Sequence, residues 1–281
     1  MVKKASPQQL ADQVKKHFDR LQDNMSLCIK YFAMWEIAWR DESLAEKLNN
    51  SSAGTGFVTL RSMASDSLLS AVVRMFEPDT KAKQSVSLSF CVSNLLNDAV
   101  FGLFIDPHLQ IGRTDSPEYL EFMSALTDTS PEELKAQSDQ GVERRKKEEF
   151  DPLKERLLGL FDILRSNDTY DMVQRLHHTR NKMVAHADLD RGININKATQ
   201  GDMKRAFFLA WEIITIMRGI ITTDYEDKRA IFSAYGTAYC LFADIKKEDI
   251  QVKANAHSFA EIKSVEFAST LKSFLKTGEF E

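Results

Sequence analysis

Apolar residues recur at helical spacing along most of the chain. Between Val14 and Trp39 they alternate at intervals of four and three residues, an average period typical of helices packed nearly side by side. This pattern predicts a long helix over about 7–49. The same pattern fits the seam of a coiled-coil dimer or a helix inside an intramolecular bundle. At this length the helix would extend about 65 Å, so we expect it to bend near Asp41–Ser43 or to project toward a partner.

The remaining chain also favours helices. Segment 85–105 alternates like a strand in its first half, but its length and its helical surroundings favour a helix. Segment 106–117 is expected to be a loop, and Asp168 is expected to cap the helix that follows it. The predicted helices after the first cover 56–77 (ended by Pro78), 85–105, 117–126, a segment starting at Ser130-Pro131, a restart at Asp151-Pro152, 168–189, 202–221, the Phe232–Phe242 region and 258–276.

These elements predict an all-α fold. We expect a helical body over 5–222 and a C-terminal helical extension over 223–281 that packs on that body. The second helix carries apolar residues on two opposite faces, so it should be buried on both sides. Asp66 lies on one of these faces, and a buried carboxylate needs a partner. The three tryptophans, Trp35, Trp39 and Trp211, fall on apolar stripes and are expected in the core.

Composition limits the classes of protein and the cellular compartments that fit this chain. The formal net charge is −4 and the chain has only 11 Gly and 6 Pro, which argues against a general nucleic-acid coating protein and fits long helices. Cys28, Cys91 and Cys240 are far apart and have no second cysteine at metal or redox spacing, so they indicate buried thiols in a reducing compartment. The N-terminus lacks the apolar run of a signal peptide, and no stretch is long enough to span a bilayer. We therefore expect a cytoplasmic protein with no membrane segment.

The segment with the clearest chemistry is Met172 to Ala187. It contains Arg175, Arg180, Lys182 and three histidines but no acidic residue. In a chain with a negative net charge, this composition indicates a local electropositive strip suited to a phosphate. Asp188 and Asp190 follow it directly, so the strip should be confined to one helix.

Arg180-Asn181 followed by His186 resembles the motif of the HEPN superfamily, in which an arginine and a histidine are separated by four to six residues. The Arg-Asn-Lys start and the Ala-His end resemble the abortive-infection subgroup. A second stretch, Asp66–Phe76, looks like an early helix of that subgroup that contains an aspartate. The resemblance covers about residues 5–220 and implies a HEPN-like helical bundle.

The resemblance also implies a metal-independent endoribonuclease that needs no cofactor. In that reaction the 2′-hydroxyl of RNA attacks the adjacent phosphate and leaves a 2′,3′-cyclic phosphate. His186 would transfer protons, since histidine titrates near neutral pH. Arg180 would hold phosphate oxygens, and Asn181 would orient the phosphate or the histidine. Asp66 would support the site by pairing with Arg180, and Lys182, His178 and Arg175 would contact the RNA.

The spacing of the motif also bears on oligomeric state. On a straight helix, positions six apart differ by about 120° and about 9 Å along the axis, so Arg180 and His186 would not share one face. Either both side chains converge across a groove, or a second subunit completes the site. The resemblance implies a homodimer in bacterial defence or a toxin–antitoxin system, with an antitoxin or regulatory protein as a further partner.

Three alternatives stay open at this point. Arg180 and His186 could form a structural pair in an inactive HEPN-like module that binds a nucleotide, RNA or a partner protein. The chain could instead be a plain interaction protein that works through helix 7–49. A zinc site from His177, His178, His186 and Asp188 is disfavoured because adjacent histidines point about 100° apart on a helix.

Overall fold

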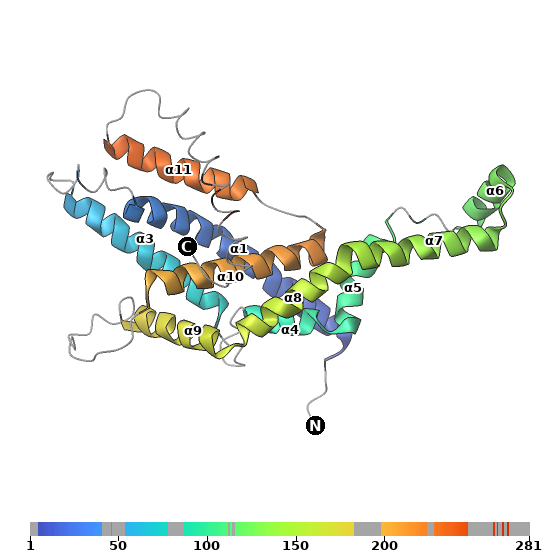
Figure 1. The fold of residues 1–281 in the computed structure, drawn as a ribbon, viewed down its shortest axis with the longest axis horizontal. Coiled ribbons are helices and arrows are strands. Elements are labelled where there is room, and N and C mark those ends of the chain that lie inside the picture. The colour runs from blue at the N-terminus through green and yellow to red at the C-terminus, as the bar shows by residue number, and fades with distance from the viewer. Residues whose placement is uncertain are drawn as a thin grey trace.

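The computed structural model describes residues 5–40, 54–77, 87–111, 113, 116–182, 198–223 and 228–246, together with single positions at 46, 261, 263, 266 and 269. Every element in these ranges is helical, which confirms the all-α prediction (Figure 1). In chain order they are α1 (Pro7–Arg40), α3 (Gly54–Met75), α4 (Leu88–Leu95), α5 (Asp98–Leu109), α6 (Pro117–Thr127), α7 (Pro131–Arg145), a π-helical turn (Lys146–Phe150), α8 (Asp151–Leu164), α9 (Asn167–Arg180), α10 (Gln200–Thr222) and α11 (Lys228–Lys246).

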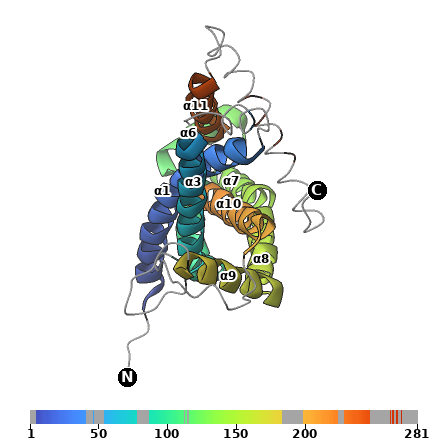
Figure 2. The ribbon, with the colours of Figure 1, turned by 90° about the vertical axis from the view of Figure 1, so that its left-hand side faces the viewer.

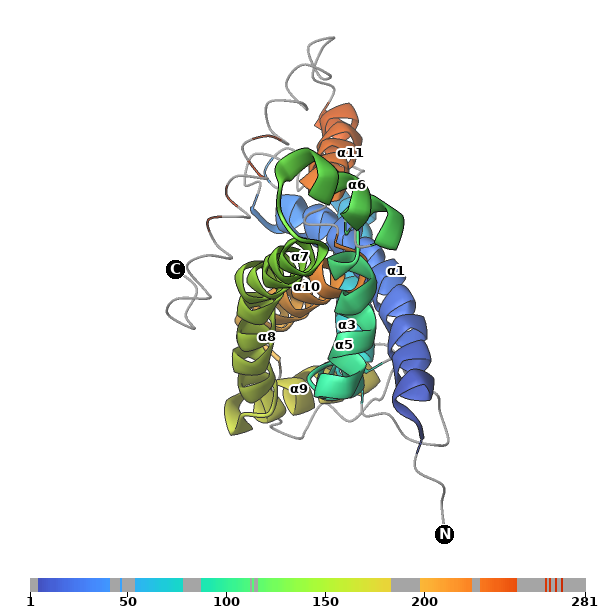
Figure 3. The same cartoon turned by 90° about the vertical axis from the view of Figure 1, so that its right-hand side faces the viewer.

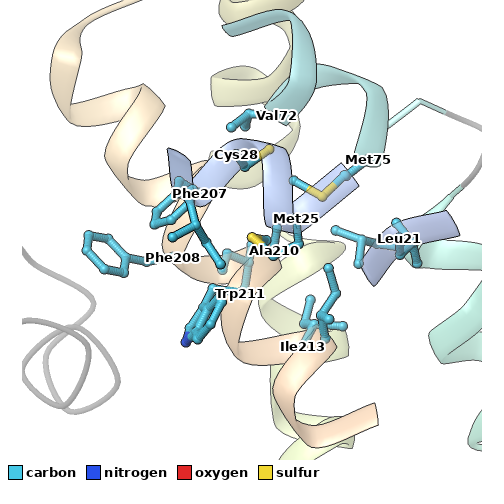
Figure 4. Packing of buried hydrophobic residues seen from close by; sticks show 14 of the residues in the cluster. Leu21, Met25, Cys28, Val72, Met75, Phe207, Phe208, Ala210, Trp211 and Ile213 are labelled. Atoms are coloured by element: carbon cyan, nitrogen blue, oxygen red, sulfur yellow. The ribbon is translucent and has the colours of Figure 1, made fainter. Parts of the chain in front are cut away.

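Helix α10 is the centre of the body. It packs against α1, α3, α8 and α9, and Figure 2 shows it enclosed by these helices. Apolar residues surround its axis on all sides, as expected for a helix buried all round. The ring of Phe207 stacks on Phe32 of α1 with centroids 4.3 Å apart, and Phe208 meets the same ring edge-on. Figure 4 shows the adjoining part of this core, where Leu21, Met25 and Cys28 of α1 lie beside side chains of α3 and α10.

The apolar seam of α1 faces the interior of its own chain. Val14, Phe18 and Leu21 are fully buried, and Phe32 and Trp35 are nearly so. The structure therefore favours the intramolecular bundle over a coiled-coil seam for this helix. The prediction for Trp39 was wrong, because its side chain is 42% exposed. Its indole N–H donates to Ser65 Oγ at 3.3 Å, a polar partner that keeps this ring at the surface.

Helix α3 is buried on both faces, as its pattern predicted. Leu68 is buried on one face, and Leu69 and Val73 are buried on the other. The predicted helix over 85–105 forms two helices, α4 and α5, which meet at 79°. Asn97 caps α5 by accepting from the Ala99 N–H. The loop expected from 106 was wrong in its first part, since α5 continues through Pro107 to Leu109. Burial of Ile105 and Leu109 outweighs the helix-breaking tendency of the proline.

The chain is helical without interruption from Pro131 to Leu164. Ser130 begins this segment with a capping box closed by Glu133, which confirms the predicted start. The expected helix start at Asp151 matches the first residue of α8, which follows a π-helical turn over Lys146–Phe150 without a break. Helix α9 is capped by Ser166 rather than by Asp168, because Ser166 Oγ accepts the Thr169 N–H at 3.2 Å and Asp168 lies in the first turn.

The extension contributes α11, which packs along α1. The Tyr235 hydroxyl donates to the Glu36 carboxylate across this contact. The boundary at 222 stays a prediction. The expected bend near Asp41–Ser43, the continuation of the α9 segment to Leu189 and most of 258–276 lie outside the described residues. Among the described helices, none by itself has the length and apolar character to cross a membrane, although the bent pair α4–α5 passes that test when taken together.

Candidate functional site

Helix α9 brings the motif to the end of α3. Met172 and Leu176 are buried, and they hold the helix against α3 and α10. These two residues are four positions apart and therefore share one face of α9. The polar residues between them lie to the sides of that face. Arg180 ends the helix and contacts Glu77, two residues after the end of α3. The fold thus places an arginine where two helices finish.

Arg180 is held by two partners. Its Nη1 donates to Glu77 Oε1 at 2.5 Å, and its Nε and Nη2 donate to Asn181 Oδ1 at 3.3 and 3.2 Å. The side chains of Arg180 and Glu77 are each 24% exposed, so water still reaches the guanidinium. These contacts use one N–H on each nitrogen, and the second N–H on each Nη atom has no partner among the described residues. The arrangement fixes the plane of the guanidinium and keeps two donors for a further acceptor.

The predicted pairing of Arg180 with Asp66 was wrong. Asp66 lies eleven residues before Glu77, about 16 Å away along α3, and α9 reaches the end of α3 rather than its middle. Asp66 accepts a hydrogen bond from Ser62, and its partial burial raises its pKa. Glu77 therefore takes the supporting position that the sequence assigned to Asp66.

Arg175 has a structural partner. Its Nε and Nη2 donate to the two carboxylate oxygens of Asp202 at 3.1 and 2.6 Å. Asp202 also closes the capping box of α10 with Thr199. Burial raises the pKa of Asp202, but hydrogen bonds from Arg175 and Thr199 outweigh this effect and hold it below the usual value. The expected RNA contact by Arg175 competes with this ion pair, which ties α9 to the start of α10.

The strip is therefore less positive than its sequence indicates. Glu77 and Asp202 lie far from it along the chain, yet they meet two of its cations directly. An acid-free segment does not by itself create a positive field, because the field depends on neighbours in space. Lys182 follows in a helical turn and is half-buried.

Two histidines precede Arg180 on α9. The pKa of His177 is lowered by burial and by the positive charge of Arg180. The negative charge of Glu77 opposes this shift. Nε2 of His178, an expected RNA contact, is buried and has no hydrogen-bond partner among the described residues.

His186 lies outside the described residues, as do the rest of 183–197. The predicted angle and distance between Arg180 and His186 on a straight helix concern the same residues, so they too lie outside the described part of the chain. Within the parts of the chain that the structure describes, no group of three histidine, cysteine or acidic residues is arranged to hold a metal ion.

A comparison with protein families matches residues 11–230 to the model of the HEPN AbiU2 family. The chain belongs to this family. The match runs from α1 into the start of α11, and it includes Glu77 and the whole Arg180–His186 motif. Membership of the HEPN AbiU2 family confirms the resemblance seen in the sequence. No curated protein and no solved structure gives a significant match to the chain.

Glu77 is the site residue that sequence reasoning missed in this HEPN AbiU2 chain. One local signal was available. An acidic residue at the C-terminal end of a helix meets the negative end of the helix dipole, which is unfavourable. Glu77 follows directly after α3, so its position calls for a cation from elsewhere. The sequence could not say which cation, because Arg180 lies 103 residues further on.

His177 reports on this ion pair. We expect Glu77→Gln to lower the pKa of His177, because Glu77 raises it, and Arg180→Met to raise the same pKa, because Arg180 lowers it. A histidine titration by NMR measures both shifts. Asp66→Asn is the matched control and should leave the titration of His177 unchanged. Shifts of the same sign in the Glu77 and Arg180 variants would contradict this arrangement.

Proposed function

We propose that this HEPN AbiU2 chain is a metal-independent endoribonuclease whose reaction centre is Arg180, Asn181 and His186. The observation that supports it most directly is the guanidinium of Arg180, which is fixed by Glu77 and Asn181 and still has donors available. An arginine that served only as a structural link would be expected to use its N–H groups within the protein. Among the described residues, two of these N–H groups have no partner, and we propose that they bind a phosphodiester.

The chemistry follows from these groups. The 2′-hydroxyl of a bound nucleotide loses its proton and attacks the adjacent phosphorus, and the 5′-oxygen leaves and gains a proton. The products are a 2′,3′-cyclic phosphate and a 5′-hydroxyl. His186 carries proton transfer, and the two free N–H groups of Arg180 stabilise the charge that develops on the phosphoryl oxygens. Lys182 contacts the RNA backbone nearby, and no cofactor takes part.

Glu77 acts on this site through Arg180. Its carboxylate binds Nη1 while Asn181 binds Nε and Nη2, so that the guanidinium is held in one orientation and the second N–H groups of Nη1 and Nη2 meet the phosphate without a search of rotamers. It is a positioning residue, because it binds the arginine and not the substrate. The cellular setting that we propose is abortive infection or a toxin–antitoxin system in the bacterial cytoplasm, where a regulatory partner restrains the nuclease.

The test is RNA cleavage by the full chain in excess EDTA. We expect cleavage to persist in EDTA and to yield fragments with 2′,3′-cyclic phosphate and 5′-hydroxyl ends, as resolved by end-specific labelling or mass spectrometry. The double variant Arg180→Ala/His186→Ala, prepared in parallel, controls for a contaminating ribonuclease. Equal cleavage by this variant would overturn the assignment. Binding of RNA without cleavage by the wild-type chain would replace the nuclease with an inactive HEPN-like binding module.

A further inference from the structure

Tyr170 is the most exposed aromatic side chain in the part of the chain that the structure describes. Its exposed fraction is 63%, compared with 60% for Phe122 and 42% for Trp39. Its hydroxyl has no hydrogen-bond partner among the described residues. The packing of α9 depends instead on Met172 and Leu176, which are buried. The ring of Tyr170 is therefore free to contact a ligand.

Tyr170 shares one stripe of α9 with residues that lead to the motif. At 100° per residue, Gln174, His177 and Asn181 all fall within about 40° of Tyr170 around the helix axis. Gln174 and Asn181 are exposed, and His177 is half-buried. Figures 2 and 3, which view the body from opposite sides, both show α9 at its lower edge. The stripe therefore follows the outward side of α9 and ends at Asn181.

The chemistry of this stripe suits a nucleic-acid strand. Asp168 and Asp171 are the acidic residues of α9, and both lie about 100° or more away from Tyr170 around the helix. The amide of Gln174 can both donate to and accept from the edge of a base. Asn181 Oδ1 accepts from the guanidinium that we propose binds the scissile phosphate. The stripe itself thus presents no negative charge to a strand that leads to that guanidinium.

The length of the stripe fits a short piece of single strand. Tyr170 lies about 16 Å from Asn181 along the axis of α9. A stacked strand advances about 3.4 Å per nucleotide and a stretched strand advances further, so at most about five nucleotides span this distance. Unpaired bases stack on aromatic side chains, and tyrosine accepts any base because every base has a face that can stack. Tyr170 is therefore within reach of a base close to the scissile phosphate.

We propose that Tyr170 stacks on an unpaired base of the RNA substrate, and that the stripe from Tyr170 to Asn181 binds the single strand that leads to the reaction centre. This inference rests on the proposed nuclease function. It adds to that function a class of substrate, single-stranded RNA, and a binding residue outside the Arg180–His186 motif. Gln174 contacts the edge of a base one turn further along α9. Tyr170 does not touch the reacting atoms, so it acts on substrate binding and leaves the chemical step unchanged.

The first test is binding of an uncleavable strand to the full chain, measured by fluorescence anisotropy. The probe is a labelled single-stranded 2′-fluoro RNA, in which no 2′-hydroxyl can attack the phosphate. Tyr170→Ala should weaken binding about tenfold, a usual loss when one base–aromatic stack is removed, whereas Tyr170→Phe should bind as wild type does. The matched control is Tyr119→Ala, which removes a tyrosine of α6 that is 38% exposed at the opposite end of the molecule (Figure 1); it should leave binding unchanged. A duplex of the same sequence should bind wild type and Tyr170→Ala equally, because its bases are already stacked.

The second test is the dependence of cleavage on RNA length. Each substrate has a single ribonucleotide in a 2′-fluoro chain, and the chain is lengthened by one nucleotide at a time on either side of it. We expect KM to fall about tenfold once the strand on one side reaches Tyr170, within about five nucleotides, with kcat nearly constant. Tyr170→Ala should abolish this step and leave the kinetics of the shorter substrates unchanged. A misfolded variant would instead lose activity on substrates of every length.

The outcomes separate the role of Tyr170 from the nuclease itself. Cleavage with the same KM and the same length dependence in wild type and Tyr170→Ala would overturn the role of Tyr170 and leave the nuclease intact. Binding that depends on Tyr170 in a chain that cleaves no RNA would support the stripe and remove the nuclease. Equal losses of binding in Tyr170→Phe and Tyr170→Ala would overturn stacking. A chain that neither binds nor cleaves single-stranded RNA would overturn both proposals.

Discussion

Replacement of Arg180 by alanine is expected to slow RNA cleavage by about 100-fold or more, the usual loss when one preorganised donor to a developing oxyanion is removed. Arg180→Lys should recover little of this loss. Lysine keeps the positive charge, but its ammonium is a single point with no planar fork. It cannot donate to Glu77, Asn181 and two phosphate oxygens in the geometry that Arg180 adopts.

Single-turnover rates on a defined RNA measure this effect without interference from product release. His186→Ala should lose about 10²–10⁴-fold through general acid–base catalysis. Arg165→Ala is the matched control, because it removes an exposed arginine whose guanidinium lies over the ring of Phe161, away from the motif. Thermal unfolding of each variant separates lost chemistry from lost fold. A fully active Arg180→Lys enzyme would show that charge alone suffices and would remove Glu77 from the mechanism.

The parts of this fold that were predictable are those set by neighbours along the chain. The spacing of Val14, Phe18 and Leu21 predicted one buried stripe, and they are fully buried. The Ser130 capping box predicted the start of α7 to the residue. Both signals are local, since a helix repeats every 3.6 residues and a cap acts over three residues. The wrong prediction for the cap of α9 comes from the same local signal, because serine and aspartate are both common N-cap residues and Ser166 lies only two positions before Asp168.

The pairings of the site were not predictable in this way. Glu77 and Asp202 meet Arg180 and Arg175 across separations of 103 and 27 residues, and no pattern along the chain encodes such contacts. The strip contains no acidic residue, as the sequence shows, but acidic residues from elsewhere in the chain pair with two of its cations and reduce its positive charge. Trp39 shows the same limit for packing, because spacing along the chain does not say which residues near the end of α1 are covered: Ile37 and Ala38 are buried, whereas Trp39 is exposed. Arg61 lies over its exposed ring instead, 3.1 Å from the centroid.

Replacement of Arg156 by methionine is expected to lower the free energy of unfolding by about 3 kcal/mol at neutral pH, because it leaves a buried charge without its partner. Glu212 lies in the middle of α10 with a side chain only 2% exposed, and it is paired with Arg156 of α8. Burial raises the pKa of Glu212, and Arg156 opposes this shift. The ion pair therefore links the central helix to α8.

The pH dependence of this loss has a definite sign. A glutamate with a folded-state pKa above its unfolded value destabilises the fold only when it is ionised. Its penalty is absent below the ordinary glutamate pKa of about 4.3 and grows as the pH rises through the raised folded value. Loss of Arg156 raises that folded value further. The difference between wild type and Arg156→Met should thus be greatest at neutral pH and disappear toward pH about 4.

Denaturant unfolding across this pH range measures the effect, and two further variants identify its origin. Arg156→Met/Glu212→Leu removes both charges and should recover most of the lost stability, as apolar replacements of buried pairs generally do. Lys154→Met, on the same helix, breaks an ion pair with Asp98, whose side chain is 92% exposed, and should cost less than about 1 kcal/mol. The main difference between the two ion pairs is the burial of the acid, which is 92% exposed in Asp98 and 2% exposed in Glu212. Equal losses in the two variants would mean that Glu212 is hydrated in solution and that the core of α10 tolerates its charge.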